Sequence, residues 1–430
     1  MDGIRRPRFY ACVFFSILMI PEMPLFEVKL LADWPSLLGP TRNGHADSKS
    51  ELQKAIEGSP KQIWKVDAGQ GYAGPAVAGK DFVLFERIGD SDRVRLLNAE
   101  TGKEVWRRDL KAGYRGGIDS DKGPRSVPTI LEKSILVYSA AGDLTLLGRN
   151  DGAILWTRAL RKDYQAEDGY FGAGSTPLVV SDQAIISVGG KSASVVCVSL
   201  TNGKTLWVSS NAEASYASPI LIEPRQGSAV TKRIVVAPMK LKTLGLDLET
   251  GKPLWEFPFG QRGPTVNAAT PVVTENGDVF LTSSYGIGSL LVRPTQSTAK
   301  IVHQGTDISS QYSTPVVLAG MIFGSDGRED GGEGAYKCLQ ASDGKLLWSQ
   351  PNMPICHTIG VGNMVLIFGI GGEIWAIDSA EAKFQPLWTS SLPVGKYRAI
   401  PAFSGNRLYT RTSNGTGDAW YCFQIGTSSR

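Results

Sequence analysis

The chain has 430 residues, of which 42% are hydrophobic and 20% are charged, and its formal net charge at pH 7 is +4. The basic residues are spread along the chain without a run that would line a nucleic-acid groove, so we expect no nucleic-acid partner. The apolar content is too high for a disordered chain, and the 49 glycines and 24 prolines are therefore attributed to turns.

The first 32 residues have the pattern of an export signal. Arg5, Arg6 and Arg8 lead into the twelve-residue apolar run FYACVFFSILMI. A run of this length is typical of a signal-peptide core and is shorter than an ordinary transmembrane helix. Cys12 does not lie where a lipid-modified cysteine would. Residues 1–32 are interpreted as a leader that exports the chain, to the periplasm or elsewhere, without lipidation; an uncleaved anchor is the alternative.

Residues 33–59 are predicted to form an arm ahead of the main domain. The stretch DWPSLLGPTRNG is punctuated by proline, which indicates an extended segment. In SKSELQKAIEGS, Ser48 and Glu51 have the spacing of a capping box, and Gly58 can end a helix. We therefore expect an extended arm followed by a short helix.

From residue 60 onward the chain repeats one pattern. The stretch DLETGKPLW joins an alternating run to a tryptophan through a Thr-Gly turn, and LNAETGKEVW, GRNDGAILW, SLTNGKTLW and ASDGKLLW have the same form. The glycine follows Thr, Asp or Asn, where a tight hairpin turn needs a positive φ. Successive tryptophan slots are 40 to 51 residues apart, with His303 in the sixth of eight slots.

A period of this length holds four short strands and their turns. Each interval contains a small-residue strand entered through proline, such as GSTPLVVS, then an apolar strand such as AIISVG, then the hairpin. No long stretch has helical periodicity, so the fold class is all-β. The sequence predicts an eight-bladed β-propeller of four-stranded antiparallel blades over residues 60–426, followed by a tail at 427–430.

The two ends of this region complement each other. The C-terminal part supplies three strands of a blade, YRAIPAFSG, RLYTRTS and AWYCFQIG, while KQIWKVDAG at the start is a tryptophan strand without a blade. Their pairing would close the ring and remove an exposed sheet edge, which invites aggregation. We therefore expect the N-terminal strand to join the C-terminal blade.

The turn-plus-tryptophan repeat, as in NAETGKEVW and DLETGKPLW, resembles the repeat of the pyrroloquinoline-quinone (PQQ) propellers. This family contains quinoprotein alcohol dehydrogenases and a non-catalytic outer-membrane-assembly propeller that binds no quinone. The resemblance implies that each indole packs between blades and that its N–H meets a backbone acceptor. The repeat tryptophans are therefore interpreted as structural: Trp64, Trp106, Trp156, Trp207, Trp255, Trp348 and Trp388.

The residues that quinoprotein catalysis would need are not found in the sequence. The resemblance implies a disulfide between adjacent cysteines and Glu, Asn and Asp ligands for Ca²⁺, but the chain has no Cys-Cys pair and no C-x-x-C-H haem motif. No His or Cys cluster has zinc spacing. The acidic loop SDGREDGGEG does not match the EF-hand spacing and is predicted to be solvated. Cys338 and Cys356 either pair or, as we expect, remain free buried thiols.

The pseudo-symmetry of a propeller points to one candidate site. The innermost strand of every blade begins at the mouth of the central channel, so equivalent positions face one another. The residue three before the repeat's proline slot is Gly174 or Ala268 in two blades. In the other six blades it can bind a ligand through an aromatic face or a charge. These candidates are Tyr72, Arg125, Tyr216, Tyr312, His357 and Arg398; the alternative is that they only plug the channel.

Two arginines near one axis repel each other unless an anion or a carboxylate such as Asp119 compensates, so a carboxylate-bearing ligand is expected here. The predicted function is an exported, non-catalytic binding or assembly scaffold whose channel mouth and rim loops hold a protein or peptide partner, or an envelope component. It would be a monomer with no cofactor, no metal and no transmembrane domain beyond the leader. The alternative is a PQQ-dependent oxidoreductase with a divergent site, and only that function requires PQQ with Ca²⁺.

Overall fold

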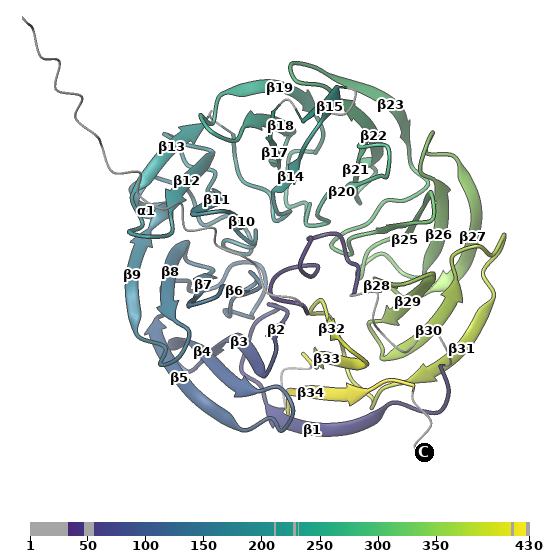
Figure 1. Cartoon of the computed structure of the whole chain (residues 1–430), viewed down its shortest axis with the longest axis horizontal. Helices are drawn as coiled ribbons and strands as arrows, with labels where there is room; N and C mark the ends of the chain where they lie inside the picture. The colour runs from purple at the N-terminus through teal and green to yellow at the C-terminus, as the bar shows by residue number, and fades with distance from the viewer. Residues whose placement is uncertain are drawn as a thin grey trace, which may run out of the picture.

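Eight four-stranded antiparallel sheets stand as blades around a central channel (Figure 1). The structure is a computed structural model that describes residues 33–46, 56–209, 212–226, 229–230, 232–413 and 417–426. It confirms the all-β, eight-bladed propeller predicted from the repeat. The predicted leader, most of the predicted short helix and the predicted tail lie outside the described residues.

The first four blades consist of β2 (Ala76–Ala78), β3 (Asp81–Ile88), β4 (Ser91–Asn98) and β5 (Glu104–Lys111); β6 (Thr129–Ile130), β7 (Ser134–Tyr138), β8 (Asp143–Gly148) and β9 (Ile154–Ala159); β10 (Leu178–Val180), β11 (Gln183–Ser187), β12 (Val195–Ser199) and β13 (Thr205–Ser209); and β14 (Ile220–Ile222), β17 (Ile234–Pro238), β18 (Lys242–Asp247) and β19 (Pro253–Pro258). The last four consist of β20 (Val272–Val273), β21 (Val279–Ser283), β22 (Gly288–Pro294) and β23 (Ala299–Gly305); β24 (Val316–Leu318), β25 (Met321–Asp326), β26 (Gly334–Gln340) and β27 (Leu346–Met353); β28 (Cys356–Val361), β29 (Met364–Gly369), β30 (Glu373–Asp378) and β31 (Pro386–Ser391); and β32 (Ala402–Ser404), β33 (Arg407–Arg411), β34 (Ala419–Gln424) and β1 (Lys61–Asp67). Outside the blades lie the helix α1 (Leu160–Asp163) and a small hairpin of β15 (Arg225–Gln226) and β16 (Ala229–Val230).

Within the described ranges, no helix has the length and apolar character needed to cross a bilayer.

The middle strands of the blades form the core because neighbouring blades cover both of their faces. Every residue of β12 is buried, whereas the outermost strand β19 alternates between buried and exposed positions. The larger apolar clusters bridge adjacent blades; for example, Val196 of β12 shares a cluster with Leu146 of β8. The apolar core therefore lies in layers between blades, as expected for a repeat architecture, and the two boundaries of the eighth blade share one cluster.

The repeat tryptophans join each blade to the next through a hydrogen bond and a ring contact. Trp207 on β13 donates its Nε1–H to the carbonyl oxygen of Leu248 at 2.9 Å, and its ring lies against Gly251 in the next blade's turn. Gly251 has a φ of +68°, and a Cβ there would overlap the indole, so turn and packing both require glycine. Equivalent bonds of 2.8–3.2 Å join Trp64 to Ala99, Trp106 to Arg149, Trp156 to Leu200 and Trp348 to Glu381.

Trp255 departs from this pattern. It is buried at a blade interface, but its Nε1 meets no acceptor among the described residues. Its ring stacks on Phe257 of the same strand, with 5.8 Å between ring centroids. The turn of the next blade, residues 295–298, has no glycine, so this ring lacks the glycine contact that Trp64, Trp106, Trp156 and Trp207 make.

Several of the repeat tryptophans on the outermost strands are partly exposed to solvent. Trp106, Trp156 and Trp388 are only partly buried. Trp388 faces the closing blade, and its Nε1–H is accepted by the carbonyl oxygen of Gly58 at 2.9 Å. His303 occupies the sixth slot, and its ring lies against the turn glycine of the next blade as the indoles do.

The ring closes between the two ends of the propeller. β1 pairs antiparallel with β34 and becomes the fourth strand of the eighth blade, as predicted. Trp64 of β1 packs edge-to-face on Phe82 of the first blade, with 5.1 Å between ring centroids. The buried Trp420 of β34 donates its Nε1–H to Oε2 of Glu86 at 2.9 Å. Both strands of the joint therefore contact the first blade.

Residues 33–46 lie in the central channel, where the sequence alone did not place them (Figure 1). Trp34 pairs with Val77 of the innermost strand β2 through two backbone hydrogen bonds, and His45 bridges to Gly360 of β28. The prediction of an extended arm is wrong for residues 33–46. The N–H of Gly39 bonds to the carbonyl oxygen of Ser36, and positive φ values at Gly39 and at other residues of the arm allow successive turns.

Arg42 anchors the arm in the channel. Its guanidinium donates to the carbonyl oxygens of Thr176, Pro177 and Pro219 at 3.1–3.3 Å. Burial lowers the pKa of Arg42 to about 10, so the group stays charged at neutral pH. Asp33 accepts a bond from the N–H of Gly79 in the β2–β3 turn, which lies at the end of the inner strand away from the mouth. The arm therefore closes the channel opposite the mouth.

Candidate functional site: the channel mouth

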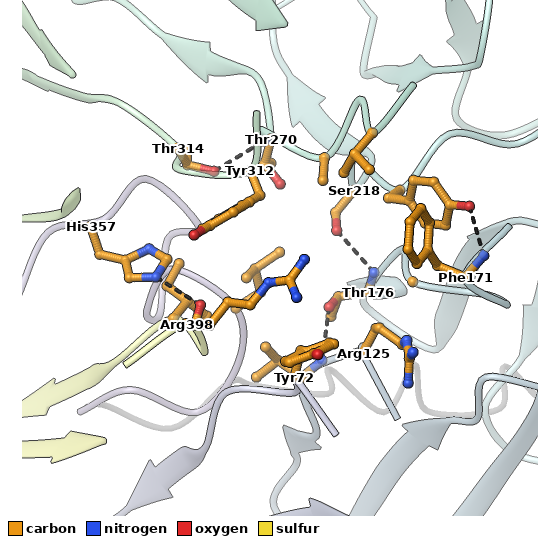
Figure 2. Close-up of a pocket in the computed structure, with 17 residues that line it drawn as sticks. Tyr72, Arg125, Phe171, Thr176, Ser218, Thr270, Tyr312, Thr314, His357 and Arg398 are labelled. Atoms are coloured by element: carbon orange, nitrogen blue, oxygen red, sulfur yellow. Dashed lines mark hydrogen bonds between the residues drawn. The ribbon is translucent and has the colours of Figure 1, made fainter. Parts of the chain in front are cut away.

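A cavity that is open to solvent lies where the innermost strands begin around the channel (Figure 2). Gly174 and Ala268, from the two blades with small residues in this slot, are part of its wall. The structure thus brings the whole predicted set together, because the same backbone position recurs in every blade. The six predicted ligand-binding residues also line the cavity: Tyr72, Arg125, Tyr216, Tyr312, His357 and Arg398.

A ring of hydroxyl side chains lies two residues further along the same strands. Thr176, Ser218, Thr270 and Thr314 all line the cavity, and each directly precedes a proline. Several accept a hydrogen bond from the neighbouring blade; the N–H of Val127 bonds to Oγ1 of Thr176 at 3.0 Å. Our reading of the sequence missed this ring, although the repeated Ser-Pro and Thr-Pro dipeptides were a signal for it.

The floor of the cavity is apolar. Leu37 from the arm, Val127 and Ile400 line it. Leu37 also packs in a small cluster with Leu38 and Val127. Among the residues that the structure describes, the arm at the far end of the channel therefore supplies the bottom of the cavity, which leaves the mouth as the entrance for a ligand.

Arg398 stands in the mouth between two aromatic rings (Figure 2). Its guanidinium carbon lies 4.1 Å from the ring centroid of Tyr72 and 5.6 Å from that of Tyr312. Its Nε lies 3.2 Å from Oε2 of Glu329, and a terminal nitrogen lies 3.7 Å from a carboxylate oxygen of Asp119. The side chain is 23% exposed, so the rings and carboxylates fix the cation while one side stays open to the cavity.

Arg125 lines the same cavity, but its guanidinium points away from Arg398 (Figure 2). Its Nη1 lies 3.0 Å from Oδ1 of Asp121, and it also donates to the carbonyl oxygen of Gly123 in its own loop. Each arginine therefore has its own carboxylate partner. These carboxylates offset the mutual repulsion from which we predicted an anionic ligand, and Arg125 helps to hold its loop together.

The tyrosines act as hydrogen-bonding groups of fixed orientation. The hydroxyl of Tyr216 accepts a bond from the N–H of Phe171 at 3.1 Å, and that of Tyr312 donates to Oε2 of Glu329 at 3.1 Å. Burial raises the pKa of Tyr72 to about 12, so this phenol is protonated at neutral pH.

Glu329 enters the site from the acidic loop between β25 and β26. The sequence predicts this loop to be solvated, but the Glu329 side chain is only 16% exposed and is bound to Arg398, Tyr312 and Lys396. The charged groups that hold Glu329 come from other blades. The spacing of residues within the loop therefore does not predict these contacts. The prediction is therefore wrong for Glu329.

His357 is buried in the wall of the cavity and is 4% exposed. Its Nε2–H donates to the carbonyl oxygen of Arg398 at 3.0 Å, which leaves Nδ1 as an acceptor. Nδ1 has no partner among the described residues. Burial is the main reason that the pKa of His357 falls to about 4, so the imidazole is neutral at pH 7.

We expect this histidine to make stability fall in mild acid. Between pH 6.5, the usual pKa of histidine, and pH 4, this side chain is protonated in the unfolded chain but stays neutral in the native protein. Proton binding therefore favours the unfolded state, and the free energy of unfolding drops as the pH falls toward 4. The full effect is about 3 kcal/mol for a shift of this size. Urea unfolding of the parent and of His357→Gln at pH 7 and pH 4.5 measures it. Equal pH dependence in the two proteins would contradict the assignment.

The residues of the mouth do not supply the ligand set that the quinoprotein resemblance implies. In the part of the chain that the structure describes, no group of three or more His, Cys, Asp or Glu side chains could hold a metal ion. The carboxylates of Asp119, Asp121 and Glu329 are engaged with arginines. Cys338 and Cys356 are free and buried between two blades, away from the cavity. Within the described residues, these carboxylates therefore form no Ca²⁺ site of the kind that the resemblance implies.

The sequence of this chain is similar to the sequences of one protein family. The sequence profile of the family described as outer membrane protein assembly factor BamB matches residues 49–220 and 90–333. The outer membrane protein assembly factor BamB of Yersinia pestis is 22% identical over 346 residues, which cover 68% of this chain and 81% of that protein.

Two solved structures share the architecture. The crystal structure of BamB from Moraxella catarrhalis has a TM-score of 0.59 at 16% identity and covers 87% of this chain and all of its own. A europium-containing methanol dehydrogenase has a TM-score of 0.62 at 11% identity, covering 91% of this chain and 98% of its own. Because an assembly factor and a dehydrogenase are both similar at this level, the structural likeness shows the fold alone.

Proposed function

Because the chain belongs to the PQQ-like propeller family described as outer membrane protein assembly factor BamB, we propose that it is an exported, non-catalytic scaffold of the cell envelope. Its partner is a protein or peptide that binds at the channel mouth and the surrounding rim loops. The scaffold works as a monomer, without lipidation and without a bound quinone or metal.

The observation that carries this proposal is the cavity at the mouth. It combines aromatic faces, hydroxyl groups and a cation that is open on one side. Such a surface suits recognition, because aromatic and arginine side chains dominate the energetics of protein interfaces. The titratable groups next to the cation are held in ion pairs or kept neutral by burial, as the low pKa of His357 illustrates, and this favours binding over acid–base chemistry.

Site-specific photocrosslinking in cells that produce the protein tests the proposal. A photoreactive residue replaces Lys122, which is exposed on the mouth face, and in a matched control it replaces Lys252, which is exposed in a turn on the opposite face. We expect discrete protein adducts only at position 122, and Arg398→Ala should remove most of them.

Equal adducts on both faces would contradict binding through the mouth. The non-catalytic part has a separate test. Dye-coupled alcohol oxidation after addition of PQQ and Ca²⁺ to the purified protein should give no turnover, and measurable turnover would overturn this part of the proposal.

A further inference from the structure

Three donors from two blade-connecting loops converge on one carboxylate at the mouth. Tyr312 donates its hydroxyl to Glu329, Arg398 lies 3.2 Å from the same carboxylate oxygen, and Lys396 contacts the other oxygen. Charge-assisted donors of this kind are the usual means of binding a carboxylate. The mouth therefore contains a complete carboxylate subsite, and a residue of the protein itself occupies it.

The segment that delivers Glu329 is joined to the mouth by side-chain contacts and by two backbone N–H groups. That of Gly327 bonds to the carbonyl oxygen of Ser309, and that of Glu329 bonds to Oε1 of Gln311. Residues 327–333 connect β25 to β26 and include Gly327 and Gly332, whose φ values are +120° and +91°. Arg328 stacks on the ring of Tyr285, with 4.9 Å from its guanidinium carbon to the ring centroid. Gly332 can adopt backbone conformations that other residues rarely adopt, whereas Gly327 is held by its bond to Ser309. Release of the carboxylate requires the bonds of Glu329 in the mouth to break, but the paired residues of β25 and β26 lie outside the segment.

A second group in the same wall lacks a partner. Nδ1 of His357 is an acceptor with no donor among the described residues, although the side chain is 96% buried and lines the cavity. The imidazole lies beside Tyr312, with 5.9 Å between ring centroids (Figure 2). A buried acceptor without a donor is destabilising. Because this atom has almost no accessible surface, an occupant of the cavity does not reach it unless the wall itself moves.

We propose that Glu329 is an intramolecular stand-in, and that the subsite of Tyr312, Lys396 and Arg398 binds an acidic side chain of a partner peptide when loop 327–333 moves aside. An acidic peptide suits this subsite, because its side chains carry the same carboxylate group as Glu329. The inference rests on the proposed function, which makes the mouth the binding surface. Glu329 then competes with the partner and sets the affinity.

Fluorescence anisotropy with labelled tetraglutamate and tetraglutamine peptides tests this inference. Glu329→Gln keeps the size of the side chain and removes the competing charge, so it should bind tetraglutamate about tenfold more tightly than the parent does. Arg398→Gln should lose this binding. Glu333→Gln is the matched control, because Glu333 is an exposed carboxylate in the same loop, and it should bind as the parent does. Circular dichroism and thermal melting establish that each variant is folded.

Three results would overturn the inference. The first is equal affinity of the parent and Glu329→Gln for tetraglutamate, and the second is equal binding of the two peptides. The third is displacement of the peptide by free glutamate or acetate at the peptide's own concentration, which would assign the subsite to a small carboxylate. If Glu329→Gln shows no gain while crosslinks at position 122 persist, this inference fails and the scaffold function stands. A gain without crosslinks would reject the scaffold function alone.

Discussion

Deletion of residues 60–68 is expected to turn the protein into an aggregating species. The deletion removes β1, so β34 loses its pairing partner and becomes an exposed edge strand. It also removes Trp64, which packs against Phe82 and Tyr409 across the joint of the ring. Both losses fall at the point where the ring closes without a covalent link. Size-exclusion chromatography with light scattering should show aggregates in place of a monomer peak.

The matched control for this deletion is Gln62→Ala combined with Lys65→Ala. Both side chains are exposed on β1, and the changes leave its backbone pairing intact. This variant should remain monomeric with a nearly unchanged melting temperature. If the deletion variant were equally soluble and melted with the parent, closure by β1 would not be needed for the stability of the ring.

Replacement of Trp207 by alanine is expected to lower the free energy of unfolding by about 3–5 kcal/mol, the range for large aromatic residues in protein cores. The side chain is 9% exposed and packs in the apolar cluster between the third and fourth blades. Its removal leaves a cavity beside Gly251 and a carbonyl oxygen at Leu248 without its donor. Urea unfolding followed by circular dichroism measures the change.

Two further variants separate the contributions of the indole. Trp207→Phe keeps most of the apolar ring and loses the hydrogen bond, which should cost about 0.5–1.5 kcal/mol beyond any packing change. Trp255→Ala removes a buried indole whose N–H has no acceptor among the described residues, so its cost should come from packing alone. A cost below about 1 kcal/mol for Trp207→Ala would show that the indole does not hold the blades together.

The features that could be predicted from the sequence are those that recur in every blade. The turn at Gly251 and the tryptophan at 255 are local signals, and their repetition determines the number of blades and the closure by β1. The mouth residues were predictable for the same reason. Tyr216 and Tyr312 occupy equivalent backbone positions, so the symmetry of the ring brings them to one cavity without any knowledge of their contacts.

The features that could not be predicted depend on contacts that occur once. Arg42 has no counterpart in the repeat, and the carbonyl oxygens that hold it belong to two blades more than 130 residues away. Glu329 reaches the mouth because Arg398 and Lys396 attract it from other blades. The orientation of Arg125 away from the axis follows from its bonds within its own loop. Such contacts are decided by side-chain conformation, which residue spacing does not report.

The arm changes the propeller channel from an open passage into a pocket that is closed at one end. An open ring is a tube, through which solutes can pass from one face to the other. With Arg42 fixed between blades and Leu37 forming the floor, the channel becomes a cup with one opening. Whatever enters must leave by the way it came, and a second occupant cannot push the first one out at the far side. Exchange of occupants is therefore limited by the departure of the one already inside, however abundant its competitor.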